Sequence, residues 1–297
     1  MKKGYLLFIA VFLISIVNAQ NTYYWTGGLS ASWASSTSWN TTLGGGGTAR
    51  TAPNTGDILI FDGSNIGSGA TGSVSVSSVQ PESITGLKLQ NAAVVTFASA
   101  VAGTSLSANI SRAAPVAVGP AGVISTVTSN IVTLPSTTGI YPGTIITAVV
   151  TTSIPTAINV VTAVNGNNIT VTQPATATTS GTSTITFSQP LNFSSSPSVL
   201  LSVGDFVYTG SSSNVEQITS IVDGQNVFTT SGTAAITAAA GFKANPLVLT
   251  GSTNALAISS GCTLTMSSAN APLIIKLAAG AKGSVDGVIT SASGNTS

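Results

Sequence analysis

Histidine is absent from the 297 residues, cysteine occurs once, and only 5% of the residues are charged. The lack of histidine removes the commonest general base of enzymes and the commonest protein ligand of transition metals. Eight basic and seven acidic residues give a formal net charge of +1, far from the basic surface that nucleic-acid binding requires. We therefore expect no nucleic-acid partner and no cofactor.

The single cysteine, Cys262, cannot form a disulfide within the chain. Its neighbours Thr263, Leu264, Thr265 and Met266 alternate between polar and apolar side chains, as in a β-strand. We expect Cys262 to be a small buried side chain in a core, and a reactive thiol is the alternative.

The residues that are abundant indicate β structure. Hydrophobic residues make up 43% of the chain, and valine, isoleucine, leucine and threonine are frequent among the strand-like runs. No segment has the period of an amphipathic helix, whereas short alternating runs recur between Gly, Asn, Ser and Pro. The clearest runs are 58–61, 73–76, 93–97, 169–172 and 273–277. The sequence predicts an all-β fold.

The first 19 residues have the pattern of a secretory signal peptide. Lys2 and Lys3 precede an apolar run over residues 5–17, and Ala19 is the small residue that precedes cleavage. The run is short for a membrane span, and an uncleaved anchor is the alternative. We expect a secreted or extracellular cell-surface protein with no membrane insertion after cleavage.

Two stretches, residues 72–102 and 246–297, share one texture of short strands separated by single Gly or Asn corners. Such closely spaced strands are typical of a solenoid, in which each strand pairs with its equivalent one coil away. We expect residues 20–102 to form an N-terminal cap and the first coils. Residues 246–297 would continue the solenoid, which we expect to be truncated.

Residues 103–245 have a different character, with eight of the 12 prolines. Asn165-Gly166 and Asp223-Gly224 each lie between apolar runs, which is a strong hairpin signal. We expect a pair of small β modules, related by a degenerate repeat, inserted into the solenoid. A simple series of separate domains is the alternative.

All three tryptophans, Trp25, Trp33 and Trp39, lie near the expected start of the solenoid. Exposed aromatic faces can stack on sugar rings, so these residues are candidates for glycan binding. The alternative, which we favour, is that they cover the open end of the solenoid, where strand edges and core would otherwise be exposed.

The acidic residues are too dispersed for a catalytic pair. Only Asp57 and Asp62 are close in sequence, at the two ends of one strand-like run, and each adjoins a glycine. Glycosidases need two carboxylates facing one bond, and calcium loops need three or more oxygen ligands nearby. We interpret both residues as turn caps and expect no catalytic residue, no metal site and no enzymatic activity.

The tryptophans belong to a longer pattern. Residues 24–28 read Tyr-Trp-Thr-Gly-Gly, Trp33 and Trp39 follow, and residues 53–63 read Pro-Asn-Thr-Gly-Asp-Ile-Leu-Ile-Phe-Asp-Gly. This pattern resembles the start of large bacterial secreted surface proteins, namely autotransporter-like adhesins and surface proteins of Bacteroidota-type bacteria. The match is good over this cap region and loose over residues 246–297.

The resemblance implies a right-handed parallel β-helix, secretion and display at the cell surface. Proteins of this kind are usually far longer, and no C-terminal sorting or anchoring domain is visible in this sequence. The expected function is a non-enzymatic stalk or adhesin segment. The alternative is a carbohydrate-binding or polysaccharide-processing β-helix whose active part lies beyond residue 297.

The expected partners follow from these two functions. They are a host or biofilm glycan, or a protein receptor. The second expected partner is another copy of the chain, because an uncapped C-terminal coil would leave an open edge for self-association.

Overall fold

The computed structural model describes residues 20–66, 73–119, 121, 123–150, 154, 159–181, 183–210, 215–230, 234–267 and 272–291. Every regular element in this part of the chain is a β-strand, which confirms the all-β prediction. No helix that could cross a membrane is found among these residues. The predicted signal peptide, residues 1–19, lies outside them.

The strands follow the alternation that the sequence predicts. In β5, Ser73–Ser77, the valines Val74 and Val76 are buried while the serines lie towards solvent. Successive side chains of a strand point to opposite faces, so this alternation places one face on a core. The hairpin predictions are confirmed as well, because Asn165-Gly166 joins β14 to β15 and Asp223-Gly224 joins β20 to β21.

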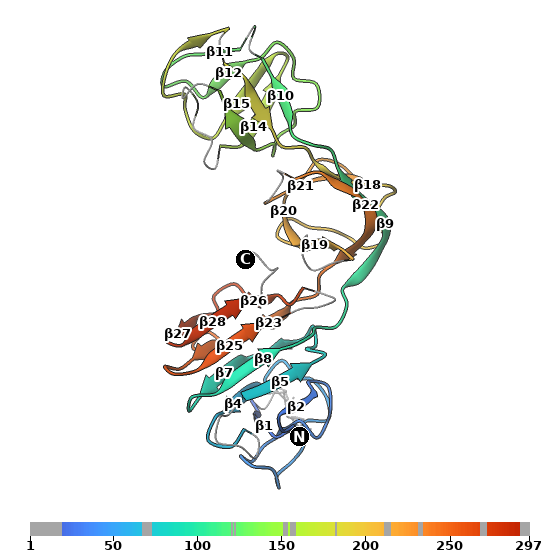
Figure 1. The fold of residues 1–297 in the computed structure, drawn as a ribbon, viewed down its shortest axis with the longest axis vertical. Helices are drawn as coiled ribbons and strands as arrows, with labels where there is room; N and C mark the ends of the chain where they lie inside the picture. The colour runs from blue at the N-terminus through green and yellow to red at the C-terminus, as the bar shows by residue number, and fades with distance from the viewer. Residues whose placement is uncertain are drawn as a thin grey trace, which may run out of the picture.

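Three sheets at one end of the molecule contain mainly parallel strands (Figure 1). The first has the order β27-β24-β7-β4-β1-β3, and only β3 is antiparallel to its neighbour. Its strands are β1 (Thr22–Trp25), β3 (Trp39–Asn40), β4 (Ile58–Asp62), β7 (Gly86–Gln90), β24 (Leu256–Ile258) and β27 (Gly283–Val285).

The other two sheets of this group are parallel throughout. One contains β2 (Ser30–Ser32), β5, β8 (Val94–Phe97), β25 (Thr263–Met266) and β28 (Val288–Ser291). The other contains β6 (Ser83–Ile84), β23 (Leu247–Leu249) and β26 (Ile275–Leu277). The chain visits the three sheets in the same order three times, as β6-β7-β8, β23-β24-β25 and β26-β27-β28.

The three sheets share one hydrophobic core. Positions in register are buried together: Leu89 pairs with Ile258 and Val95 pairs with Leu264, and none of these side chains is more than 1% exposed. Cys262 belongs to the same cluster and is fully buried, which confirms the prediction of a buried thiol.

Two corners between strands require glycine because of close backbone packing. A Cβ atom at Gly63 would overlap the carbonyl oxygen of Asn91, and one at Gly287 would lie 2.5 Å from the carbonyl oxygen of Cys262. Any larger residue would have to push the neighbouring backbone away. The glycines therefore allow consecutive turns to stack directly on one another.

Six strands form a closed antiparallel barrel next to the parallel sheets (Figure 1). They are β9 (Thr104–Arg112), β18 (Leu191–Phe193), β19 (Phe206–Thr209), β20 (Val215–Ile221), β21 (Asn226–Thr229) and β22 (Ile236–Lys243). Thr104 at the start of β9 pairs with Lys243 at the end of β22. The chain therefore enters and leaves the barrel at the same place.

Eight further strands form a small module between β9 and β18. They are β10 (Val116–Val118), β11 (Ile124–Ser125), β12 (Ile131–Thr133), β13 (Ile146–Val149), β14 (Val161–Asn165), β15 (Asn168–Val171), β16 (Thr179–Ser180) and β17 (Ile185–Phe187). The strand pairs of the module and the barrel correspond, as the predicted degenerate repeat requires: β13 pairs with β17 as β19 pairs with β22, and the hairpins β14–β15 and β20–β21 each contain a register shift. The backbone N–H of Gly143 donates to the carbonyl oxygen of Val161, and that of Gly204 donates in the same way to Ile218. The two halves differ in closure, because the module forms two sheets and the other half a closed barrel.

Candidate functional site

The three tryptophans form one aromatic cluster beneath β1 and β3. The rings of Trp25 and Trp33 each lie 5.0 Å from the ring of Trp39 in edge-on contact, and Phe61 and Phe97 extend the cluster. Edge-on pairs of this kind are a favourable aromatic geometry. The cluster fills the core of the parallel sheets at the end where the chain begins its first strands.

The exposure of these rings decides between the two interpretations of Trp25, Trp33 and Trp39. Their side chains are only 2%, 1% and 1% exposed, and each indole N–H already donates to a protein oxygen. A ring buried to this degree offers no face to a sugar. We therefore correct the glycan-stacking alternative: in this structure the tryptophans pack the core.

A buried ion cluster stands beside the tryptophans. The Arg50 guanidinium donates to Asp57 Oδ2 at 2.7 Å and to both carboxylate oxygens of Glu82 at 3.0 Å, while Trp33 donates to Glu82 Oε1 at 2.6 Å. Burial alone would lower the pKa of Arg50, but Glu82 and Asp57 outweigh it and raise that pKa above its ordinary value. The cluster fastens the segment around Arg50 to the sheets.

The carboxylates that were candidates for chemistry hold turns instead. Asp57 Oδ2 accepts the backbone N–H of Asn54, and Asp62 Oδ1 accepts the backbone N–H and the hydroxyl of Ser64. These contacts confirm the interpretation as turn caps. Gln90 and Asn91, on the next connection, also donate to Asp62, and the hydrogen bonds outweigh burial, so that the pKa of Asp62 is lowered.

The barrel contains a second buried ion pair. Arg112 Nη1 and Nη2 donate to the two carboxylate oxygens of Glu216 at 2.6 Å, and the hydroxyl of Thr229 donates to the same carboxylate. Arg112 Nε donates to the backbone carbonyl of Ala234 at 2.8 Å. Because the charges balance and are surrounded by hydrogen bonds, this pair acts as a cross-link between strands.

No group of three or more His, Cys, Asp or Glu side chains that could hold a metal ion occurs among the described residues. Carboxylates among the described residues instead accept hydrogen bonds within turns or pair with arginine and lysine side chains.

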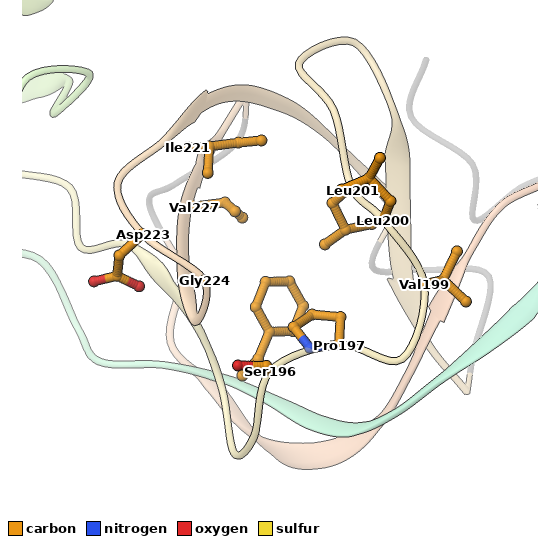
Figure 2. Close-up of a pocket in the computed structure, with 10 residues that line it drawn as sticks. Ser196, Pro197, Val199, Leu200, Leu201, Ile221, Asp223, Gly224 and Val227 are labelled. Carbon is orange, nitrogen blue, oxygen red and sulfur yellow. The ribbon is translucent and has the colours of Figure 1, made fainter.

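A hollow of about 280 Å³ opens at one end of the barrel (Figure 2). Its floor is apolar, and the loop between β18 and β19 forms one wall while the β20–β21 turn forms the other. The lining residues are Phe193, Ser196, Pro197, Val199, Leu200, Leu201, Ile221, Asp223, Gly224 and Val227. Figure 2 places Leu200 and Leu201 across the hollow from Val227, and it shows the Asp223 carboxylate on the outer side of the β20–β21 turn, pointing away from the hollow.

The side chain of Leu200 is 86% exposed, although its backbone is held firmly. Lys243 Nζ donates to the carbonyl oxygen of Leu200 at 3.1 Å and pairs with Asp205 at 2.7 Å. The backbone N–H of Ser198 donates to the carbonyl oxygen of Leu106 on β9. A loop tied at several points therefore presents a large apolar side chain to solvent.

The opposite wall is fixed as well. The Asp223 carboxylate accepts hydrogen bonds from the backbone N–H of Gln225 at 2.7 Å and from Asn226 Nδ2 at 3.0 Å. These hydrogen bonds, from Gln225 first, lower the pKa of Asp223. None of the ion pairs found among the described residues includes Asp223, and its carboxylate serves to hold the β20–β21 turn.

Sequence reasoning did not single out Leu200, Ile221 or the arginine pairs. The partners Arg50 and Glu82 lie 32 residues apart, and Arg112 and Glu216 lie 104 apart, so no local spacing signals them. The rarity of charge is the one signal in the sequence, because an arginine in a chain with only 5% charged residues is expected to have an acidic partner. The hollow left no comparable signal.

No known protein family, no curated protein and no solved structure matches this chain.

Proposed function

We propose that the chain is a non-enzymatic segment of a secreted cell-surface stalk or adhesin. In this proposal the three parallel sheets are the walls of a right-handed parallel β-helix that begins in residues 20–102 and continues in 246–297. Residues 103–245 are an insertion that projects from the surface of the β-helix.

One observation carries the proposal: strands on either side of the 103–245 segment pair in parallel in all three sheets. Leu87 pairs with Leu256, Val95 with Leu264, and Ser83 with Val248. The cyclic order of the strands and the shared core support a coil that resumes after the insertion, because each sheet gains its next strand in turn.

The resemblance of residues 24–63 to the start of bacterial surface proteins supports a location at the cell surface. The aromatic cluster supports the role of that region as a cap, since it fills the core at the end where the chain enters the sheets. The engagement of the described carboxylates in turns and ion pairs supports a role that does not involve catalysis.

Surface labelling tests this proposal directly. An antibody against the purified chain should label intact cells of the source organism, and a strain that lacks the gene should adhere less to surfaces or to other cells. Labelling only after the cells are permeabilised would contradict it.

The absence of enzymatic activity has its own test. The purified chain should release no product from a panel of neutral and anionic glycans. Product formation that disappears in Asp57→Asn or Asp223→Asn would contradict the proposal and favour the polysaccharide-processing alternative.

A further inference from the structure

A small apolar cluster lies at the base of the barrel, where the barrel meets the parallel sheets (Figure 1). Its largest buried side chain is Tyr208 on β19, which is only 2% exposed and whose ring stacks on that of Phe242 on β22 at a centroid distance of 5.3 Å. Ala244, in the segment that leaves the barrel, is buried beside them. This cluster is separate from the core of the barrel and from the core of the sheets.

One side chain of the cluster comes from the parallel sheets. Ile274 directly precedes β26 and packs against the cluster, whereas its neighbour Ile275 packs against the core of the sheets. The carbonyl oxygen of Ile274 accepts the backbone N–H of Leu247 at the start of β23, so the sheets fix its position. Consecutive side chains of an extended chain point to opposite sides, and these two isoleucines therefore reach two different cores.

Two further contacts hold the segments that connect the barrel to the sheets. The hydroxyl oxygen of Tyr208 accepts the backbone N–H of Gly103 at 2.8 Å, just before β9 begins. Asn245 Nδ2, beyond the end of β22, donates to Thr104 Oγ1 at 3.1 Å. The two segments pack closely, because a Cβ atom at Gly103 would overlap the carbonyl oxygen of Lys243.

The connection alone does not fix the direction of the barrel. Parts of a protein that are joined by few chain segments are expected to move relative to one another unless apolar packing holds them. The two connecting segments determine where the barrel is attached, but a pair of strands can bend and twist. Ile274 adds a contact from a third segment of the chain. Contacts at three separate points leave no axis about which the barrel can turn freely.

We propose that this cluster is a joint that holds the barrel in one orientation relative to the parallel sheets, and that Ile274 is the side chain that closes it. Without Ile274 the barrel stays folded but swings on the segments 103–104 and 243–245. The inference goes beyond the proposed function and requires neither secretion nor adhesion, because it follows from contacts within the chain.

The distance between the sheets and the barrel measures the joint. Spin labels are attached to the purified full chain through Ser73→Cys on β5 and Thr219→Cys on β20, which are both exposed positions. Cys262 is fully buried and is left in place. Pulsed electron paramagnetic resonance then gives the distribution of distances between the labels. The doubly labelled chain should give a single narrow peak, and Ile274→Ser should replace that peak by a broad distribution.

The adjacent residue provides the matched control. Ile275→Ser removes an identical side chain that packs against the core of the sheets, so it should lower stability and leave the narrow peak unchanged. Ile274→Met conserves most of the side-chain volume and should keep the narrow peak as well. Far-UV circular dichroism of each variant shows whether the strands are formed.

A second measurement concerns Tyr208. Tyr208→Phe keeps the stacked ring and removes the hydroxyl that accepts the N–H of Gly103, so hydrogen exchange of the Gly103 amide should become faster. Unchanged exchange at this amide would show that the contact does not hold the connecting segment.

Three results of the distance measurement would overturn the inference. The first is a broad distribution in the labelled chain with the cluster intact, which needs no variant of the cluster and decides the question even if Ile274→Ser does not fold. The second is a narrow peak that persists in a folded Ile274→Ser. The third is an equal broadening in Ile274→Ser and Ile275→Ser, because it would reflect a general loss of stability and not a joint.

Discussion

Arg50 and Arg112 are buried against carboxylates, one in the parallel sheets and one in the barrel. Removing one member of such a pair leaves an uncompensated buried charge, which costs far more than the pair itself contributes. Each of these two arginines therefore joins segments that are distant in sequence. The tryptophans do the same by packing, because Trp33 contacts Phe97 and its indole donates to Glu82.

Trp39→Ala should lower the free energy of unfolding by about 3–5 kcal/mol, because it leaves a large cavity in the aromatic cluster. Denaturant unfolding followed by far-UV circular dichroism measures the change. Leu29→Ala, at a position that is 53% exposed, is the control and should change stability by less than about 0.5 kcal/mol. Equal stability of the two variants would show that the cluster does not hold the fold.

Asp62 predicts a dependence of stability on pH. Its pKa is lowered in the folded chain, so the ionised carboxylate contributes stability above its ordinary pKa of 3.8, and this contribution is lost as the pH falls through the folded value. Asp62→Asn should therefore be less stable than the parent at neutral pH, and the difference should shrink below pH 3.8. A difference that stays constant with pH would contradict the assignment.

At the scale of elements, the sequence predicts those strands and turns that are determined by residues adjacent in the chain. The alternation over residues 73–76 and the turn Asn165-Gly166 are local, and both the strand and the hairpin are present. The pairing of Leu87 with Leu256 and the exposure of Leu200 depend on distant segments. Leu200 has the same local pattern as a core leucine, so its exposed place beside the hollow could not be read from sequence.

Gly63 directly follows β4 and packs closely against the backbone of the next connection, so its replacement should affect stability. Gly63→Ala would drive a Cβ atom into the Asn91 carbonyl and should destabilise the chain by about 1–3 kcal/mol. Gly210→Ala is the matched control, because a Cβ atom at Gly210 would meet no atom of the described residues within 4 Å. Thermal unfolding of both variants compares them, and equal melting temperatures would show that the corner relaxes freely.

At the scale of the whole molecule, the barrel and the module lie between two strand triplets that are paired with each other. Thr104 and Lys243 are paired where the barrel begins and ends, so the segment leaves and rejoins the sheets at one place. Insertions of this type disturb a host little, because chain closure depends weakly on loop length.

Deletion of residues 103–245, with a short Gly-Ser link between the flanks, should leave a soluble β-rich protein. The separated 103–245 segment should fold as well, since the barrel and the module have core clusters of their own. Circular dichroism and cooperative thermal unfolding of both pieces provide the measurement. Loss of folding in both pieces would favour one continuous domain.

The pairing of Thr104 with Lys243 also has a consequence for the order of folding. Contacts between residues far apart in sequence form slowly, because the chain loses loop entropy before any contact compensates for it. Until the barrel has closed, Leu87 and Leu256 are the ends of a long flexible loop. A closed barrel holds its two ends side by side. The loop that must close before Leu87 and Leu256 can pair is then only a few residues long on each side of the barrel. The last strand triplets should therefore assemble only after the barrel, and a variant that slows barrel closure should delay the parallel sheets as well.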